Sequence, residues 1–371
     1  MNDLIPPLGA DGQIKAEVNG CLGLVTLNRP QALNALSLAM IRDLTALLRH
    51  WADAPQIQAV ALLGAGREGK PPAFCAGGDI RFFHQAAHAG DPALGHFFTE
   101  EYRLNHLIHH YPKPTVALMD GVVMGGGMGI SQGAKLRVLS ERSRLAMPET
   151  GIGLFPDVGG GWFLAQCPGH VGEWLALTGQ SIAAGDAIEW GLGDVFVRSE
   201  QWPALVEDLR RGEQPSAEHV VATVMERVDL APVSAPKATL DRIDRHFGQP
   251  TVAAILESLG QADDDWARDS RATLLKRSPL MLAVTLELLR RARRLSLADD
   301  LRLERDLVHH AFHLRGAERS ETVEGIRALA VDKDHAPRWN PPTVADVEAA
   351  EVAAFFASPW APDEHPLRDL A

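Results

Sequence analysis

The first half of the chain alternates short apolar runs with amphipathic segments. Residues 14–18 and 22–27 are typical of two strands of a hairpin, separated by Asn19-Gly20, a dipeptide common in hairpin turns. Pro30 then ends the strand pattern, because proline cannot donate a ladder hydrogen bond. Residues 59–63 form an apolar run typical of a buried strand, and residues 115–119 and 137–139 are also predicted to be strands.

Helical periodicity separates these strands. Leu44, Leu48 and Trp51 recur on one face of a predicted helix that follows Pro30. A glycine-rich helix start is predicted at Gly125, and a further helix over residues 162–177. Strand–strand–helix units in succession indicate an α/β architecture with stacked layers.

After about residue 200 the pattern becomes mainly helical. The predicted helices cover residues 203–211, 217–228, 252–259, 281–294 and 296–314. In the last of these, Leu297, Leu301, Val308 and Phe312 share one face. We therefore predict two domains, an α/β core over residues 1–200 and a mostly helical domain over residues 201–371.

Composition narrows the class of protein. With 371 residues, 46% of them hydrophobic, the chain can bury a large core, which excludes a disordered or fibrous protein. Its 36 basic and 48 acidic residues give a net charge of −12, which disfavours a nucleic-acid partner, although a local basic patch could still bind a phosphate.

The sequence also bears on the compartment. Cys21, Cys75 and Cys167 lie far apart without metal-ligand spacing, so we interpret them as free thiols of a reducing environment. The N-terminal residues show no secretory pattern, and no apolar run approaches the ~20 residues needed to cross a bilayer. We predict a cytoplasmic protein without membrane partners and without a bound metal, since the histidines show no ligand spacing.

Two glycine-rich segments are candidates for binding an oxyanion. In residues 73–80, AFCAGGDI, an apolar run ends in two glycines and an acid, where backbone N–H groups can face a ligand. The alternative is a structural turn with Asp79 as a helix cap. In residues 119–129, MDGVVMGGGMG, consecutive glycines open a helix at a cost of about 1 kcal/mol each relative to alanine. They imply close approach to another part of the chain or to an oxyanion.

A third segment, MPETGIGLFPDVGGG at residues 147–161, contains Glu149 and Asp157 among apolar residues and glycines, with no basic neighbour. Buried carboxyl groups without a local countercharge tend to have a raised pKa, as general acid–base groups require. The structural alternative is that Glu149 satisfies a loop and that Asp157 caps the following helix. Two acids in so apolar a stretch favour a catalytic role.

Together with the segment NRPQALNAL, these motifs resemble, in order and spacing, the crotonase (enoyl-CoA hydratase/isomerase) superfamily over residues 13–200. The resemblance implies a ββα spiral core, followed here by a mostly helical C-terminal domain. It also implies a bound acyl-CoA whose thioester oxygen is held by the backbone N–H groups of Gly78 and Gly126. Coenzyme A would be part of the substrate, and no separate cofactor is implied.

Within the superfamily, the chain is most similar to the 3-hydroxyisobutyryl-CoA hydrolases. Gly129 stands where the hydratases carry one of their two catalytic glutamates, whereas Asp157 in FPDVGGG matches the hydrolases. The helix at residues 97–105 and segments near residues 276–279 and 331–339 extend the similarity over most of the chain.

The resemblance implies a role for each residue in thioester hydrolysis. Glu149 would attack the carbonyl carbon or activate a water molecule, Asp157 would assist proton transfer, and Glu101 would orient the hydroxyl of a short 3-hydroxyacyl group. The sequence leaves open whether a covalent anhydride forms. It also leaves open whether the chain is a homo-oligomer, since the helical half could cover the surface that other members use for association.

Other features of the chain suggest rival functions. Residues 129–133 match the GxSxG pattern of serine hydrolases, but Ser131 is predicted inside a helix rather than at the required strand-to-helix turn. Cys75 lacks an adjacent base and is interpreted as a packing residue. The basic run at residues 290–294 is interpreted as a solvated face, with binding of CoA phosphates as the alternative.

Two further functions remain open. A hydratase or isomerase acting on an enoyl-CoA is the main enzymatic alternative. A non-catalytic RNA-binding or structural relative is the other, because a fold does not determine a function. The intact Glu149, Asp157 and glycine loops argue against loss of the site.

Overall fold

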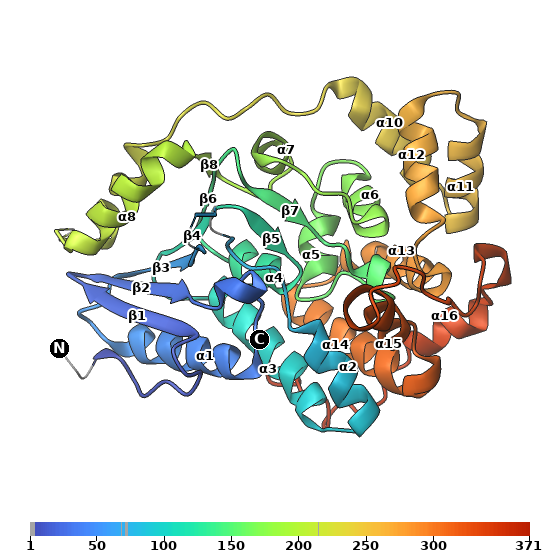
Figure 1. Cartoon of the computed structure of the whole chain (residues 1–371), viewed down its shortest axis with the longest axis horizontal. Coiled ribbons are helices and arrows are strands. Elements are labelled where there is room, and N and C mark those ends of the chain that lie inside the picture. The colour runs from blue at the N-terminus through green and yellow to red at the C-terminus, as the bar shows by residue number, and fades with distance from the viewer. Residues whose placement is uncertain (1–3, 68, 71–72, 214) are drawn as a thin grey trace. The chain divides into compact units, whose positions relative to one another are not determined.

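The computed structural model describes residues 4–67, 69–70, 73–213 and 215–371. The chain forms two compact units that alternate along the sequence (Figure 1). The first unit comprises residues 1–78, 103–145 and 182–234, and the second comprises residues 79–102, 146–181 and 235–371. Neither unit follows the predicted boundary at residue 200, so independent folding of residues 1–200 and 201–371 stays a prediction.

The first unit begins with the predicted hairpin. Strand β1 (Ile14–Asn19) pairs antiparallel with β2 (Leu22–Leu27), and Asn19 lies opposite Leu22. The two-residue loop is therefore Gly20-Cys21, one position later than predicted. Gly20 has a φ of 57°, a left-handed conformation that glycine adopts without steric cost.

Among the described residues, the main sheet has six strands in the order β1-β2-β3-β4-β6-β8, and every pair after the hairpin is parallel. The predicted strands at residues 59–63, 115–119 and 137–139 are confirmed as β3, β4 and β6. A separate two-stranded sheet pairs β5 with β7. The bounds are β3 Ala59–Gly64, β4 Thr115–Met119, β5 Val122–Met124, β6 Leu136–Leu139, β7 Arg144–Ala146 and β8 Val195–Phe196.

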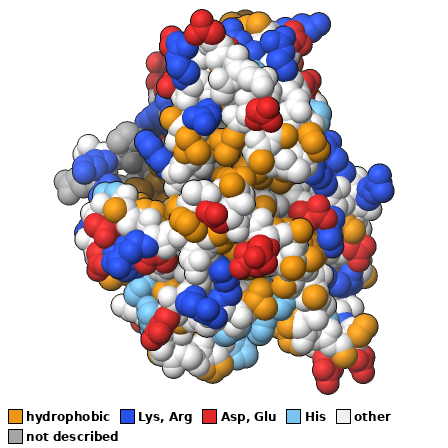
Figure 2. Space-filling view, turned by 90° about the vertical axis from the view of Figure 1, so that its right-hand side faces the viewer, with side chains coloured by type: hydrophobic (Ala, Val, Ile, Leu, Met, Phe, Trp, Pro, Cys, Tyr) orange, Lys and Arg blue, Asp and Glu red, His pale blue; other side chains and the backbone are white. Residues whose placement is uncertain are grey.

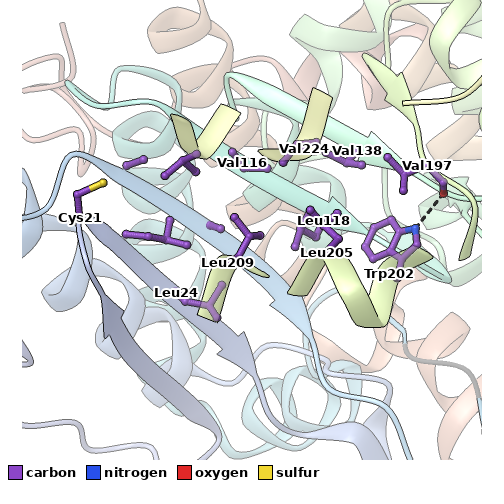
Figure 3. Packing of buried hydrophobic residues seen from close by; sticks show 14 residues of the cluster. Cys21, Leu24, Val116, Leu118, Val138, Val197, Trp202, Leu205, Leu209 and Val224 are labelled. Carbon is purple, nitrogen blue, oxygen red and sulfur yellow. Dashed lines mark hydrogen bonds between the residues drawn. The ribbon is translucent and has the colours of Figure 1, made fainter. Parts of the chain in front are cut away.

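Helices cover both faces of the main sheet, which explains why the sequences of the inner strands β2 and β3 are mostly apolar. On one face, Gly23 lies against the indole of Trp51 in α1 (Leu38–Asp53), where a Cβ would stand 2.6 Å from the ring. On the other face, Leu22 and Leu24 belong to one buried cluster with residues of α8 (Trp202–Arg211) and α9 (Ala217–Met225). Figure 3 shows Leu24 near Leu209 of α8. Residues beyond 200 thus complete the core of the first unit.

The second unit is helical in the part of the chain that the structure describes. The predicted helix over residues 162–177 is wrong as a single element: it is two helices, interrupted where Gly169 adopts a φ of 56° after Pro168. Proline cannot donate the helical hydrogen bond, and the glycine turns the chain.

The remaining helices have these bounds: α2 Ile80–Ala89, α3 Ala93–His109, α4 Gly126–Gln132, α5 Gly160–Ala165, α6 Val171–Thr178, α7 Ala184–Glu189, α10 Lys237–Phe247, α11 Val252–Gln261, α12 Asp265–Leu274, α13 Pro279–Ala292, α14 Leu297–His313, α15 Glu321–Ile326 and α16 Ala349–Phe355. The C-terminal helices therefore confirm the helical pattern of the sequence. Within the described residues, no helix is both long enough and apolar enough to cross a membrane.

Candidate active site

The two predicted oxyanion-binding loops lie side by side in the first unit. The Cys75 N–H donates to the Val122 carbonyl at 3.0 Å, and the Met124 N–H donates to the Cys75 carbonyl at 3.0 Å. A Cβ on Gly127 would stand 2.3 Å from the Cys75 carbonyl oxygen. The glycine run is thus required for close approach of one loop to the other.

This pairing brings the segments of Gly78 and Gly126 together. A Cβ on Gly77, whose φ is +100°, would stand 3.6 Å from the Gly126 nitrogen. Helix α4 begins at Gly126, so this N–H belongs to the first turn, whose N–H groups have no intrahelical acceptor. A helix N-terminus favours negative charge, which suits an oxyanion.

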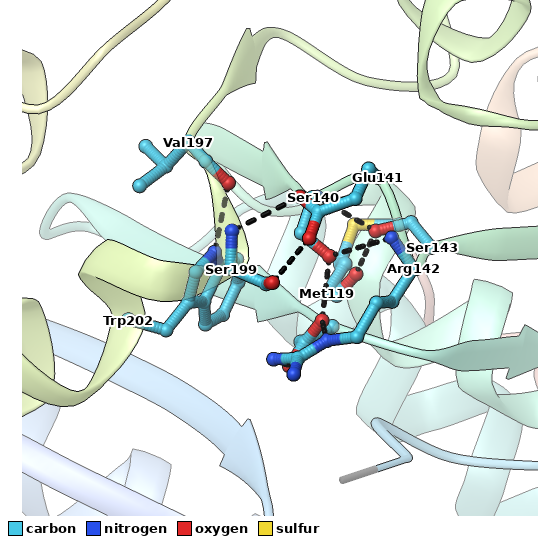
Figure 4. Close-up of polar contacts among 9 residues, drawn as sticks. Met119, Ser140, Glu141, Arg142, Ser143, Val197, Ser199 and Trp202 are labelled. Atoms are coloured by element: carbon cyan, nitrogen blue, oxygen red, sulfur yellow. Dashed lines mark hydrogen bonds and ion pairs between the residues drawn. The ribbon is translucent and has the colours of Figure 1, made fainter. Parts of the chain in front are cut away.

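A polar network supports the chain just before the second loop (Figure 4). The Asp120 carboxylate accepts hydrogen bonds from the Ser140 hydroxyl at 2.5 Å and from Arg142 Nε at 3.0 Å. The Ser143 hydroxyl donates to the Met119 carbonyl at 2.6 Å. The end of β4 is therefore fixed, and with it the chain that leads to Gly126.

The predicted carboxyl groups gather in the second unit. Glu101 lies on α3, Glu149 opens a 3₁₀ helix (Glu149–Ile152), and Asp157 lies in the loop before α5. Their side chains are buried, with 2%, 6% and 5% exposure respectively. The Tyr102 hydroxyl donates a hydrogen bond to Asp157 Oδ2 at 2.8 Å.

Burial and mutual repulsion make these groups hard to ionise. Desolvation raises the pKa of Glu101 well above its ordinary value, and the charges of Asp157 and Glu149 raise it further. Desolvation, and then the charge of Asp157, likewise raises the pKa of Glu149. Desolvation raises the pKa of Asp157 to about 6, although the Tyr102 hydrogen bond opposes the shift. Asp157 is thus the acid of this cluster that ionises most easily.

The structural interpretation of Asp157 as a helix cap is wrong, whereas that of Glu149 is not decided. Among the described residues, Glu149 Oε2 has no hydrogen-bond partner, although a backbone hydrogen bond at Glu149 favours its carboxylate. The cap of α5 is Gly159, and no side chain of that residue or of Asp157 caps it. Glu101 Oε1 also has no partner within the described part of the chain. Buried unpaired carboxyl oxygens are rare unless a ligand or water meets them.

Two other sequence interpretations have clear outcomes. The Asp79 carboxylate accepts the Phe82 N–H at 3.3 Å and caps α2, as the structural alternative for this residue predicted. Ser131 lies inside α4, and its hydroxyl donates to the carbonyls of Gly127 at 2.8 Å and Met128 at 3.1 Å. The serine-hydrolase pattern is therefore accidental.

Replacing Ser131 by alanine is expected to leave thioester hydrolysis within about twofold of the wild type, because the hydroxyl bonds only its own helix. The measurement is kcat with any acyl-CoA that the enzyme accepts. Loss of activity in a folded Ser131→Ala protein would restore the serine-hydrolase interpretation.

The arginines of the basic run at residues 290–293 make hydrogen bonds and ion pairs with other residues. Arg290 donates to the carbonyls of Gln249 and Pro250, Arg291 pairs with Glu287, and Arg293 pairs with Glu173. These arginines are engaged within their own unit. Among the described residues, no group of histidine, cysteine or acidic side chains has the arrangement of a metal site.

Tyr102 was not singled out by sequence, although it directly follows Glu101. Replacing it by phenylalanine is expected to lower kcat about tenfold, because a hydrogen bond to a charged group contributes about 1.5–3 kcal/mol. The loss of the donor also raises the pKa of Asp157 further, so its limb of the pH–rate profile should move to higher pH. An unchanged profile in Tyr102→Phe would contradict this role.

The chain belongs to the enoyl-CoA hydratase/isomerase family, because the sequence model of this family matches residues 22–356. This confirms the predicted crotonase-type α/β fold. Among curated relatives, the mitochondrial 3-hydroxyisobutyryl-CoA hydrolase of Rattus norvegicus is 40% identical over 93% of this chain and 89% of its own length. The protein of the same name from Homo sapiens is 38% identical over 93% of this chain and 89% of its own length.

Two solved structures share the fold over nearly all of the chain. A carnitinyl-CoA dehydratase from Mycobacterium thermoresistibile has a TM-score of 0.87 and 36% identity, over 96% of this chain and 99% of its own. An enoyl-CoA hydratase from Rhodobacter sphaeroides 2.4.1 has a TM-score of 0.82 and 38% identity, over 94% of this chain and 98% of its own. The helical C-terminal segment is therefore shared with these proteins.

Proposed function

We propose that this enzyme hydrolyses 3-hydroxyisobutyryl-CoA to 3-hydroxyisobutyrate and coenzyme A. The observation that carries the proposal is the buried cluster of Glu149, Asp157 and Glu101 in a chain about 40% identical to hydrolases of that name. Gly129, which has no side chain to move a proton, fits hydrolysis better than hydration of a double bond.

The proposed reaction uses backbone and side-chain groups in turn. The N–H groups of Gly78 and Gly126 would stabilise the negative charge that develops on the thioester oxygen. Glu149 would add to the carbonyl carbon, or would take a proton from a water molecule that adds instead. The carbon–sulfur bond then breaks, and the departing thiolate of coenzyme A takes a proton whose transfer Asp157 assists. If Glu149 is the group that adds, water must then hydrolyse the resulting mixed anhydride, which releases 3-hydroxyisobutyrate and restores the Glu149 carboxylate.

Glu101 is proposed to select the acyl group. Burial and the charges of Asp157 and Glu149 raise its pKa and so favour the protonated carboxyl group, which can both donate and accept a hydrogen bond. Its buried, unpartnered Oε1 suits the hydroxyl of a 3-hydroxyacyl chain. An acyl-CoA that lacks this hydroxyl would leave the acid unsatisfied, and such polar mismatches are costly.

The substrate supplies its own coenzyme A, and we propose no separate cofactor. Figure 2 shows a face on which basic, acidic and hydrophobic side chains are interspersed. Together with the net charge of −12, this mixed surface supports a small-molecule substrate rather than a nucleic acid. We further propose a place in valine degradation, as the relatives' substrate suggests.

For the compartment, the proposal remains the cytoplasm. All three cysteines, Cys21, Cys75 and Cys167, are buried and form no disulfide, which fits a reducing environment. The relatives, by contrast, are named as mitochondrial proteins. Fractionation of cells that express the chain tests the proposal directly.

A hydratase is the second candidate, because two similar proteins of known structure are named as a carnitinyl-CoA dehydratase and an enoyl-CoA hydratase. Thiol release from (S)-3-hydroxyisobutyryl-CoA, followed with a thiol-reactive dye, separates the two functions. Fast release supports hydrolysis. Absence of release, together with loss of enoyl absorbance from a short enoyl-CoA, would replace hydrolysis by hydration as the function.

A further inference from the structure

The turn that carries Asp157 has an unusual backbone. Val158 has a φ of 60° and Gly159 has a φ of 86°. A left-handed conformation is uncommon for any residue other than glycine and is an outlier for a β-branched one. Such a conformation persists only where surrounding contacts hold it in place.

The contacts that hold this turn come from α14. The Gly159 N–H donates to Glu304 Oε2 at 2.7 Å, and the Gly161 N–H donates to Glu304 Oε1 at 2.9 Å. The Trp162 N–H donates to Asp300 Oδ2 at 2.8 Å. The remaining N–H of the turn, that of Gly160, donates to the Asp157 carbonyl at 2.7 Å.

Every backbone donor from Gly159 to Trp162 thus has an acceptor, and Glu304 supplies two of the four. Helix α5 has no side-chain cap of its own, so the cap comes from residues 138 to 145 positions later in the chain. Asp300 and Glu304 are one helical turn apart and both have 0% exposure.

The glycine run makes room for these carboxyl groups. A Cβ on Gly161 would stand 2.6 Å from Asp300 Oδ1, and one on Gly159 would stand 3.1 Å from Leu297 in the same helix. The sequence GGG after Asp157-Val158 is therefore needed for contact with α14. Desolvation raises the pKa of Glu304, and the charges of Asp300 and Asp157 raise it further, whereas the two N–H groups favour its carboxylate.

We propose that Glu304 is a positioning residue of the hydrolase, which holds the strained Asp157-Val158-Gly159 turn and so sets the place of the Asp157 carboxyl group. This inference rests on the proposed function for its catalytic consequence. Its structural part concerns only the turn itself and can be tested without substrate.

The variant Glu304→Gln tests the proposal, because the amide keeps the size of the side chain but retains one acceptor oxygen for two N–H donors. We expect kcat for thiol release to fall by about 10- to 100-fold with KM changed less than about threefold, since small misplacements of a catalytic group cost rate. Amide hydrogen exchange of residues 157–162 should become faster in the variant.

Glu173→Gln is the matched control. Glu173 is also a buried glutamate, 3% exposed and paired with Arg293 at 2.6 Å, but it does not contact the turn. It should lower the melting temperature without changing kcat or the exchange of residues 157–162. Equal effects of both variants on kcat per folded molecule would overturn the positioning role.

A double variant gives the decisive comparison. If Glu304 acts through Asp157, the double variant should have a kcat within about twofold of that of Asp157→Asn alone, because the effects of coupled groups are not additive. Full additivity would overturn the proposal. If Glu304→Gln does not fold, Asp300→Asn replaces it, with faster exchange expected at Trp162 and a smaller loss of kcat.

The two proposals can fail separately. If the wild-type protein releases no thiol, the proposed function is wrong, and with it the catalytic consequence proposed for Glu304. Unchanged exchange at residues 157–162 in Glu304→Gln removes the positioning role even if hydrolysis is fast.

Discussion

Replacing Glu149 by glutamine is expected to lower kcat for hydrolysis of 3-hydroxyisobutyryl-CoA by about 10²- to 10⁴-fold, the range that a general acid–base group contributes. The amide can neither add to the thioester carbon as a carboxylate nor accept a proton from water. The side chain is buried and one of its oxygens has no partner within the described chain, so glutamine changes the chemistry of the group with little change in volume.

The measurement is single-turnover and steady-state thiol release at pH 7 to 9, with circular dichroism to establish that the variant is folded. Glu173→Gln, also a buried glutamate, serves as the control and should keep wild-type kcat. A Glu149→Gln protein that retains more than about a tenth of the wild-type rate would exclude Glu149 as nucleophile or base.

The strands were predictable because burial on both faces gives a local signal. Residues 59–63 and 115–119 are uninterrupted apolar runs, and the structure places them as β3 and β4 in the middle of the sheet. Strands β5, β7 and β8 are three residues or shorter. Such short elements are decided by their partners rather than by their own sequence.

The domain boundary was less predictable. The periodicity of a helix shows which of its faces is buried, but it does not show which element packs against that face. The sequence pattern that includes Leu205 and Leu209 predicts a helix, now α8, and we assigned it to the helical second half of the chain. In the structure they pack on the main sheet of the first unit. Periodicity alone therefore assigns the element and leaves its partner open.

Some residues of the candidate site could be predicted from the sequence and others could not. Glu149, Asp157 and the glycine loops were found because rare residue patterns mark them in the sequence. Glu304 was missed, since it lies more than 140 residues from its hydrogen-bond partners and sits on an ordinary amphipathic helix. Near Glu304 in the sequence, Asp300 is one helical turn away, and Leu301 and Leu307 lie close to the same face of the helix. This pattern does not distinguish buried acids from exposed ones.

Replacing Asp157 by asparagine is expected to lower kcat by about 10²- to 10⁴-fold as well, because asparagine cannot assist proton transfer to the departing thiolate. The pH dependence gives the sharper test. The charge of Asp157 raises the pKa of Glu149, so removing this charge lowers that pKa. The limb of the residual pH–rate profile that reports ionisation of Glu149 should therefore move to lower pH. A shift to higher pH would contradict the arrangement of the cluster.

The same substitution should leave stability intact or raise it. Burial raises the pKa of Asp157 to about 6 in the folded protein, above the ~3.9 of an unfolded chain. The contribution of this group to stability is therefore complete below about pH 4 and is lost as the pH rises through about 6. Asparagine does not ionise, so Asp157→Asn should unfold at the same or higher temperature than the wild type at pH 7. Thermal unfolding at pH 5 and pH 8 checks this, and a variant less stable only at pH 8 would reverse the sign. A loss of activity without a loss of stability would show that the protein tolerates a destabilising acid at this position because the reaction needs it.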